Sequence, residues 1–202
     1  MRPAHAATIA GTLLIAVGPP SALAAPINLR PYELRPSDVG GAKIVYDRPQ
    51  TGIPKIFRAA ATRRFASARA GGSTFKLNQD IYLATSSYFA RAVYDQLLRV
   101  ELPKTLKSIA TSTKLVRTVQ RSWKVSLGDT SGGRVLEGTT TQAQPGIPKG
   151  TRVRFYVVAI QVGSALTAIT ALPNAAPDKR AEAALRTILA RAAKREAALG
   201  TR

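Results

Sequence analysis

A serine close to an aspartate between glycines is the first pattern in this chain that could support catalysis. The segment Gly128–Gly133 places Ser131 two residues after Asp129. Attack by a serine hydroxyl needs an imidazole to accept its proton. His5 is the only histidine, and it lies in a segment that we expect to be removed on export. We therefore interpret Gly128–Gly133 as a turn between two strands.

A second serine has the spacing Ser-x-x-Lys, formed by Ser73 and Lys76. This pattern is similar to that of penicillin-recognising serine enzymes, in which one helical turn brings the lysine beside the nucleophile. Here the residues that follow alternate with period two, which predicts a strand and places the two side chains on opposite faces. The companion Ser-Asp-Asn and Lys-Thr-Gly segments are absent. We therefore expect no enzyme activity from this motif.

Metal and carboxylate chemistry has little support in the sequence. The chain has no cysteine, and without His5 it has no histidine, so zinc and copper lack their usual ligands. The acidic residues are scattered singly, although Asp80, Asp129 and Glu137 could meet in space. Solvated or salt-bridged surface carboxylates remain the simpler interpretation. We expect no metal site and no cofactor.

The strongest positive signal is a group of cations between residues 103 and 121. Apolar residues at three- and four-residue spacing predict a helix from Pro103 to about Gln120, in which Ile109, Leu115, Val116 and Val119 share one side. No acidic residue occurs between Lys104 and Arg121. The opposite side of this helix is the candidate anion-binding face, and it comprises Lys104, Lys107, Lys114, Arg117 and Arg121. A charged, merely solvated helix face is the alternative, and Arg63, Arg64, Arg152 and Arg154 could extend the surface.

The rest of the chain alternates between strand and helix patterns. We expect strands near Lys43–Tyr46, Thr74–Ala84, Arg134–Thr141, Arg152–Gln161 and Ala165–Leu172. Short connections join the last three, which predicts an antiparallel meander. Helices are expected after the Ser86 cap and after the Asp178 cap, and the second of these ends at Gly200. The fold class is therefore α+β, with an antiparallel sheet and helices packed on one face.

This order of elements resembles that of small secreted domains of the PsbP and Mog1 type. The resemblance rests on the meander that contains Thr151–Val158 and on the closing helix at Ala181–Ala192, and it covers Lys43 to Leu199. It implies a binding or accessory domain and supplies no catalytic residue.

The first residues have the three parts of an export signal. Arg2 gives a charged tip, an apolar run follows from about Ala6 to Val17, and small residues come next. Ala22 and Ala24 satisfy a signal peptidase, which predicts cleavage before Ala25. The run is shorter than the roughly 20 residues that span a bilayer, so we expect no transmembrane span in the mature chain.

The expected organisation is a signal peptide at 1–24, an extended leader rich in proline and glycine at 25–41, and one basic domain at 42–200. The chain has 30 Lys and Arg against 11 Asp and Glu, a formal net charge of +19. Such a field attracts anions. We therefore expect a secreted or periplasmic, non-enzymatic domain that binds an anionic envelope polymer, lipid head groups or an acidic protein, with nucleic acid less favoured. The alternative is a protein-interaction or accessory module whose charge only keeps it in solution.

Overall fold

The computed structural model describes residues 27–70, 72–143, 147–173 and 178–200. Within these residues, seven strands form one antiparallel sheet in the order β1-β2-β3-β7-β6-β5-β4. The strands are β1 (Ile44–Pro49), β2 (Phe57–Ala70), β3 (Ser73–Ala84), β4 (Leu115–Trp123), β5 (Thr130–Thr140), β6 (Arg152–Val162) and β7 (Ala165–Pro173). The α+β class, the antiparallel sheet and the β5-β6-β7 meander are thus confirmed.

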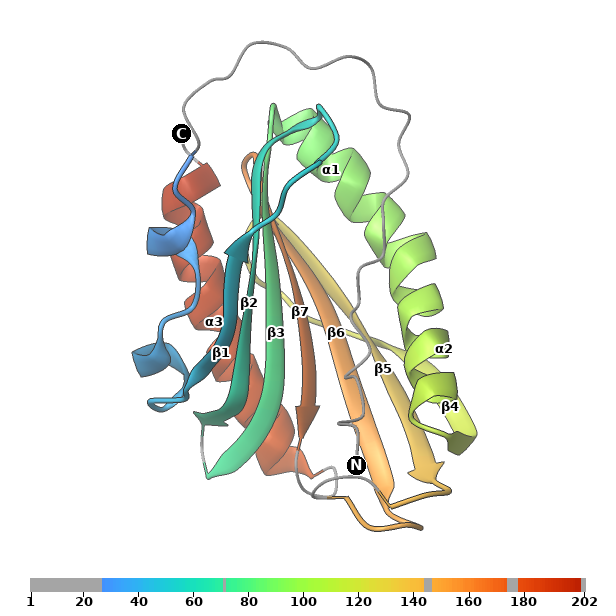
Figure 1. The fold of residues 1–202 in the computed structure, drawn as a ribbon. Coiled ribbons are helices and arrows are strands. Elements are labelled where there is room, and N and C mark those ends of the chain that lie inside the picture. The colour runs from blue at the N-terminus through green and yellow to red at the C-terminus, as the bar shows by residue number, and fades with distance from the viewer. Residues whose placement is uncertain (1–26, 71, 144–146, 174–177, 201–202) are drawn as a thin grey trace.

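The helices cover both faces of the sheet (Figure 1), whereas the sequence led us to expect one. On one face lies α3 (Lys179–Gly200); on the other lie α1 (Ser87–Gln96) and α2 (Leu102–Ser112), joined by a π-helical turn, η3 (Leu97–Glu101). Helices cover both faces because β6 is apolar on both sides. Phe155 and Val157 pack under α2, and Tyr156 and Val158 pack under α3. Both sides of this strand are apolar, so both need a cover.

The patterns of α1 and α3 match the structure well. The Ser86 hydroxyl accepts a 3.2 Å hydrogen bond from the Phe89 amide and caps α1, and Asp178 accepts a 2.6 Å bond from the Ala181 amide and caps α3. An apolar stripe of α3 is buried against the sheet, and it includes Ala181, Ala184, Leu185, Ile188, Leu189 and Ala192.

Residues 27–43, which precede β1, belong to the domain and do not form an extended leader. Two 3-10 turns, η1 (Arg30–Tyr32) and η2 (Pro36–Val39), fold this segment against α3 and β2, and Leu34 and Val39 are completely buried. Arg195 of α3 holds this segment through a 2.5 Å contact with the Asp38 carboxylate. The leader prediction failed because proline excludes long helices and interior strands but is compatible with short 3-10 turns.

The helix expected from Pro103 to Gln120 is in fact one helix and one strand. Helix α2 ends at Ser112, where the hydroxyls of Thr111, Ser112 and Thr113 donate to the carbonyl oxygens of the last turn. Lys114 then adopts a left-handed backbone conformation with φ 49°, and the chain reverses into β4. Hydroxyl side chains that bond to nearby backbone compete with helix continuation, and the β-branched residues of β4 favour a strand.

Candidate anion-binding surface

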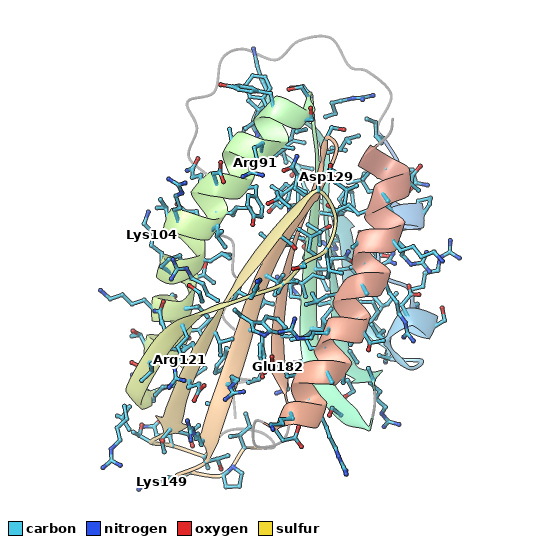
Figure 2. All side chains as sticks on the ribbon, turned by 180° about the vertical axis from the view of Figure 1, so that it is seen from behind. Arg91, Lys104, Arg121, Asp129, Lys149 and Glu182 are labelled. Carbon is cyan, nitrogen blue, oxygen red and sulfur yellow. The ribbon has the colours of Figure 1, made fainter. Side chains whose placement is uncertain are left out.

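The five cations predicted to form a basic helix face do not share a face. Lys104 and Lys107 lie on α2, Lys114 lies in the turn after it, and Arg117 and Arg121 lie on β4. Lys104 also forms a 3.4 Å ion pair with Glu101, an acid just outside the predicted stripe. Figure 2 shows Lys104 on the side of the molecule away from α3. The basic helix face therefore does not exist.

Arg121 faces the other side of the sheet. It lies opposite Val135 in the β4-β5 ladder, and directly paired residues of antiparallel strands point to the same face. Val135 packs in the core under α3, so Arg121 faces the α3 side. Glu137 lies two residues further along β5 and hence on this same face, where the charge of Arg121 acts on it.

The neighbouring strand adds two more arginines to this face. Arg154 lies opposite Glu137 in the β5-β6 ladder, and Arg152 lies two residues away on the same face. Nη2 of Arg152 lies 2.5 Å from Oε2 of Glu137, and Nη2 of Arg154 lies 2.9 Å from Oε1. Each oxygen of this carboxylate thus receives a different guanidinium, while the Arg152 side chain remains 67% exposed.

The first turns of α3 complete the group. Nη2 of Arg186 lies 3.1 Å from Oε1 of Glu182, and Nη1 of Arg154 lies 3.8 Å from Oε2 of the same carboxylate. Arg154 therefore connects the sheet carboxylate to the helix carboxylate. Figure 2 shows Glu182 on α3 beside the sheet. We call this group the arginine cluster, and it consists of Arg121, Arg152, Arg154, Arg186, Glu137 and Glu182.

Two aromatic side chains form the floor beneath the arginine cluster. The rings of Trp123 and Tyr156 lie 4.9 Å apart, and the Arg186 guanidinium lies 4.7 Å from the centre of the Trp123 indole. Nη1 of Arg154 lies 3.4 Å from the Tyr156 hydroxyl. Tyr156 is completely buried and Trp123 is nearly so, so both rings are packed in the core beneath the guanidinium groups.

The electrostatics keep both carboxylates ionised. Burial raises the pKa of Glu137, but the hydrogen bond from Arg152 and the charges of Arg154, Arg152 and Arg121 outweigh it, so its pKa is lowered. Burial also raises the pKa of Glu182, but the hydrogen bonds from Trp123 and Arg186 outweigh this effect, so the pKa of Glu182 is lowered as well. Four permanent cations thus surround two anions, and the cluster has an excess of positive charge.

The structure gives the other predicted polar residues structural partners. Arg63 is buried and pairs with Glu33 at 2.6 Å and with Asp47 at 2.8 Å, and the Arg64 guanidinium lies over the Tyr46 ring. These two arginines therefore do not extend the surface. Asp80 accepts hydrogen bonds from Thr62 and Asn78, and Asp129 accepts a 2.6 Å bond from the Gly163 amide. The carboxylates of Asp80, Asp129 and Glu137 thus have separate partners.

Neither serine motif has catalytic geometry. Ser131 lies at the start of β5, where its hydroxyl accepts a 2.7 Å bond from the Leu127 amide and donates to the Val125 carbonyl. Ser73 and Lys76 lie on β3, as the strand interpretation predicted, and their odd spacing puts them on opposite faces. Within the described ranges, no group of three or more metal-ligating residues occurs.

Two further observations concern the whole described chain. A hollow of about 520 Å³ lies between η1, β2, β3 and the end of α3, and among its described lining residues, which are mainly apolar, Arg58 is the one cation. Of the helices that the structure describes, none has both the length and the apolar character needed to cross a membrane.

The sequence-based prediction included Arg121, Arg152 and Arg154 as separate candidates, but it did not include Glu182 and Arg186 in the site. Their spacing of four residues on α3 was a local signal of an ion pair, yet only the packing of α3 on the sheet brings them to Arg154.

The predicted cleavage residues Ala22, Ala24 and Ala25 lie outside the described residues. Comparisons of the chain with protein-family models, curated proteins and solved structures give no match. The functional inference therefore depends on the arginine cluster.

Proposed function

We propose that this chain is an exported, non-catalytic domain that binds an anionic partner of the cell envelope through the arginine cluster. One observation carries the proposal: arginines from β6 and α3 converge on two carboxylates, and Arg152 and Arg186 keep much of their side chains exposed. Arg121 of β4 adds its charge on the same face. A guanidinium offers several donors in a planar fork, so it can hold a carboxylate or phosphate of a partner while retaining an internal pair.

The internal pairs support binding in a second way. Glu137 and Glu182 fix the positions of Arg152, Arg154 and Arg186 before a partner arrives. Preorganised donors lose less side-chain entropy on binding than free ones do. A set of equally charged but unpaired lysines would need to be ordered by the ligand itself.

Replacement of the exposed arginines tests the proposal. Arg121, Arg152 and Arg186 are changed together to Gln, and binding is measured with vesicles that contain phosphatidylglycerol and with polygalacturonate, at low and high salt. Trp123, the only tryptophan, lies in the cluster and provides the fluorescence signal. Each cation near an anionic surface contributes roughly 1 kcal/mol, so affinity at low salt should fall about a hundredfold.

The matched control removes three cations from the other side of the sheet, by changing Arg99, Lys104 and Lys107 to Gln. These residues are exposed on η3 and α2. The control should bind nearly like the wild type. Equal losses in both triple variants would show that only total charge matters, and unchanged binding in both would favour the accessory module with solubilising charge. Circular dichroism separates lost binding from unfolding.

Export is part of the same proposal and has its own test. Mass spectrometry of the protein recovered from an exporting host should show Ala25 as the first residue. Recovery of the chain from Met1 in the cytoplasm would contradict the envelope location.

A further inference from the structure

The two edges of the sheet differ in how they are protected. Strand β1 spans six residues and ends at Pro49, and Asp47 on it pairs with Arg63. Short length and proline are common devices against unwanted strand pairing. Strand β4 spans nine residues without proline, and in the described chain no strand pairs with its outer edge. All side chains from Val116 to Ser122 are exposed.

The charged side chains on and beside β4 are all positive. Arg117 and Arg121 lie on the strand, Lys114 and Lys124 flank it, and no acidic residue occurs between Glu101 and Asp129. Cations on an edge strand repel a second copy of a chain that is itself strongly positive. The same cations attract an extended segment that carries carboxylates. Val116 and Val119, each 46% exposed, offer β-branched surface to such a segment.

The regular part of this edge is short and well defined. A bulge between Val116 and Val119 interrupts pairing with β5, and Arg117 lies in it with φ 53°. From Val119 to Trp123 each residue has a partner on β5, from Glu137 to Gly133. In an antiparallel strand, backbone amides and carbonyls of alternate residues point to the two sides, so this stretch presents outward groups that none of the described strands pairs.

We propose that the outer edge of β4, from Val119 to Trp123, accepts an extended acidic segment of a partner protein as an additional strand of the sheet. Backbone hydrogen bonds would provide much of the affinity, and a carboxylate across from Arg121 would provide selectivity. Because Arg121 belongs to the arginine cluster, this inference rests on the proposed function and specifies the partner as an acidic protein segment, rather than a polymer or lipid.

A peptide of seven residues that alternates glutamate with valine, blocked at both ends, tests the inference. Hydrogen exchange measured by NMR should show slowed exchange of alternate amides between Val119 and Trp123, namely those that exchange fast in the free protein. Capture of the peptide by side chains alone would leave these amides unchanged and would overturn the inference. A matched peptide with lysine in place of glutamate should not bind.

Exposed substitutions locate the contact. Arg121→Gln should weaken peptide binding about threefold and the double change Arg117→Gln with Arg121→Gln about tenfold, as for exposed ion pairs. The double change Lys104→Gln with Lys107→Gln removes equal charge from α2 and should have no effect. Proline at one residue whose outward amide was protected should remove the peptide's protection of the other outward amides of β4, with circular dichroism to confirm the fold.

The outcomes separate the two proposals. Suppose that polygalacturonate or vesicles bind but the peptide does not protect the β4 amides. This result would overturn the added strand and leave the arginine cluster as an anion site. Failure of all anionic probes would overturn both. Equal binding of the glutamate and lysine peptides would overturn the charge selectivity and, with it, the proposed partner.

Discussion

The indole nitrogen of Trp123 donates a 2.8 Å hydrogen bond to Oε1 of Glu182, which ties the last residue of β4 to the first turns of α3. Trp123 and Glu182 are 59 residues apart in the chain. The same oxygen accepts from Arg186, whose other terminal nitrogen donates 3.0 Å to the Lys124 carbonyl. Helix α3 is thereby attached to the edge of the sheet that carries the arginine cluster.

Glu182→Gln should weaken this attachment. The amide removes the negative charge that Arg154 and Arg186 face, and we expect a loss of about 1 kcal/mol in the free energy of unfolding, as for a charge-assisted hydrogen bond. Urea denaturation followed by Trp123 fluorescence measures it. The control Glu101→Gln removes one member of a solvated pair with Lys104 and should cost less than about 0.5 kcal/mol. Equal effects would contradict a special role for Glu182.

Glu137 should contribute stability that is lost at acid pH. Its pKa is lowered in the folded state, because the hydrogen bond from Arg152 and three arginine charges outweigh burial. As pH falls, Glu137 is therefore protonated first in the unfolded state. Its contribution to stability is complete above its ordinary pKa of 4.5. It is lost as pH falls through the lower folded pKa. The difference in unfolding free energy between the wild type and Glu137→Gln should be constant from pH 6 to 7 and shrink below 4.5. A constant difference down to pH 3 would contradict this assignment.

Glu196 should show the opposite pH dependence. It is completely buried on α3, and burial raises its pKa well above the usual range, an effect that the Thr167 hydroxyl counters only in part. The folded state thus holds this proton more tightly than the unfolded state does, so stability falls as pH rises through the interval between the two pKa values. Glu196→Gln should stabilise the protein at pH 8 and have much less effect at pH 4. Thermal unfolding at both pH values provides the measurement; destabilisation at pH 8 would show that the ionised carboxylate is needed.

Ser131 should matter for stability and not as a nucleophile. Its hydroxyl joins the Leu127 amide to the Val125 carbonyl, so Ser131→Ala should cost about 1 kcal/mol through the unpaired backbone groups. Ser122→Ala, on the exposed edge of β4, should change stability by less than about 0.5 kcal/mol. A fluorophosphonate probe should label neither Ser73 nor Ser131. Stoichiometric labelling of either would overturn the non-catalytic assignment.

The sequence predicted those elements whose burial has a clear period. Strand β3 buries Phe75, Leu77 and Ile81 at alternate positions, and α3 buries its stripe at helical spacing. Strand β2 was not predicted, because its alanines and arginines give little contrast between faces. Strand β4 was mistaken for a helix, since Leu115, Val116 and Val119 fit helical spacing as well as a bulged strand.

The arginine cluster could be predicted only in fragments. Arg121, Arg152 and Arg154 lie on separate strands, and their common face depends on the register of β4, β5 and β6. That register, including a bulge near Arg117, is not encoded by any local spacing. The contribution of Glu182 and Arg186 depends further on where α3 crosses the sheet, which is a property of the packed core.

The strand order also determines when the molecule can fold. Strand β7 lies between β3 and β6, so within the described sheet β7 joins β1-β2-β3 to β4-β5-β6. Residues paired between β3 and β7 are about 80 to 100 positions apart, and such long-range pairing slows folding. A chain still emerging from the ribosome cannot close this sheet before Ala165–Pro173 has been synthesised. Until then, β3 and β6 each lack one of their two neighbouring strands.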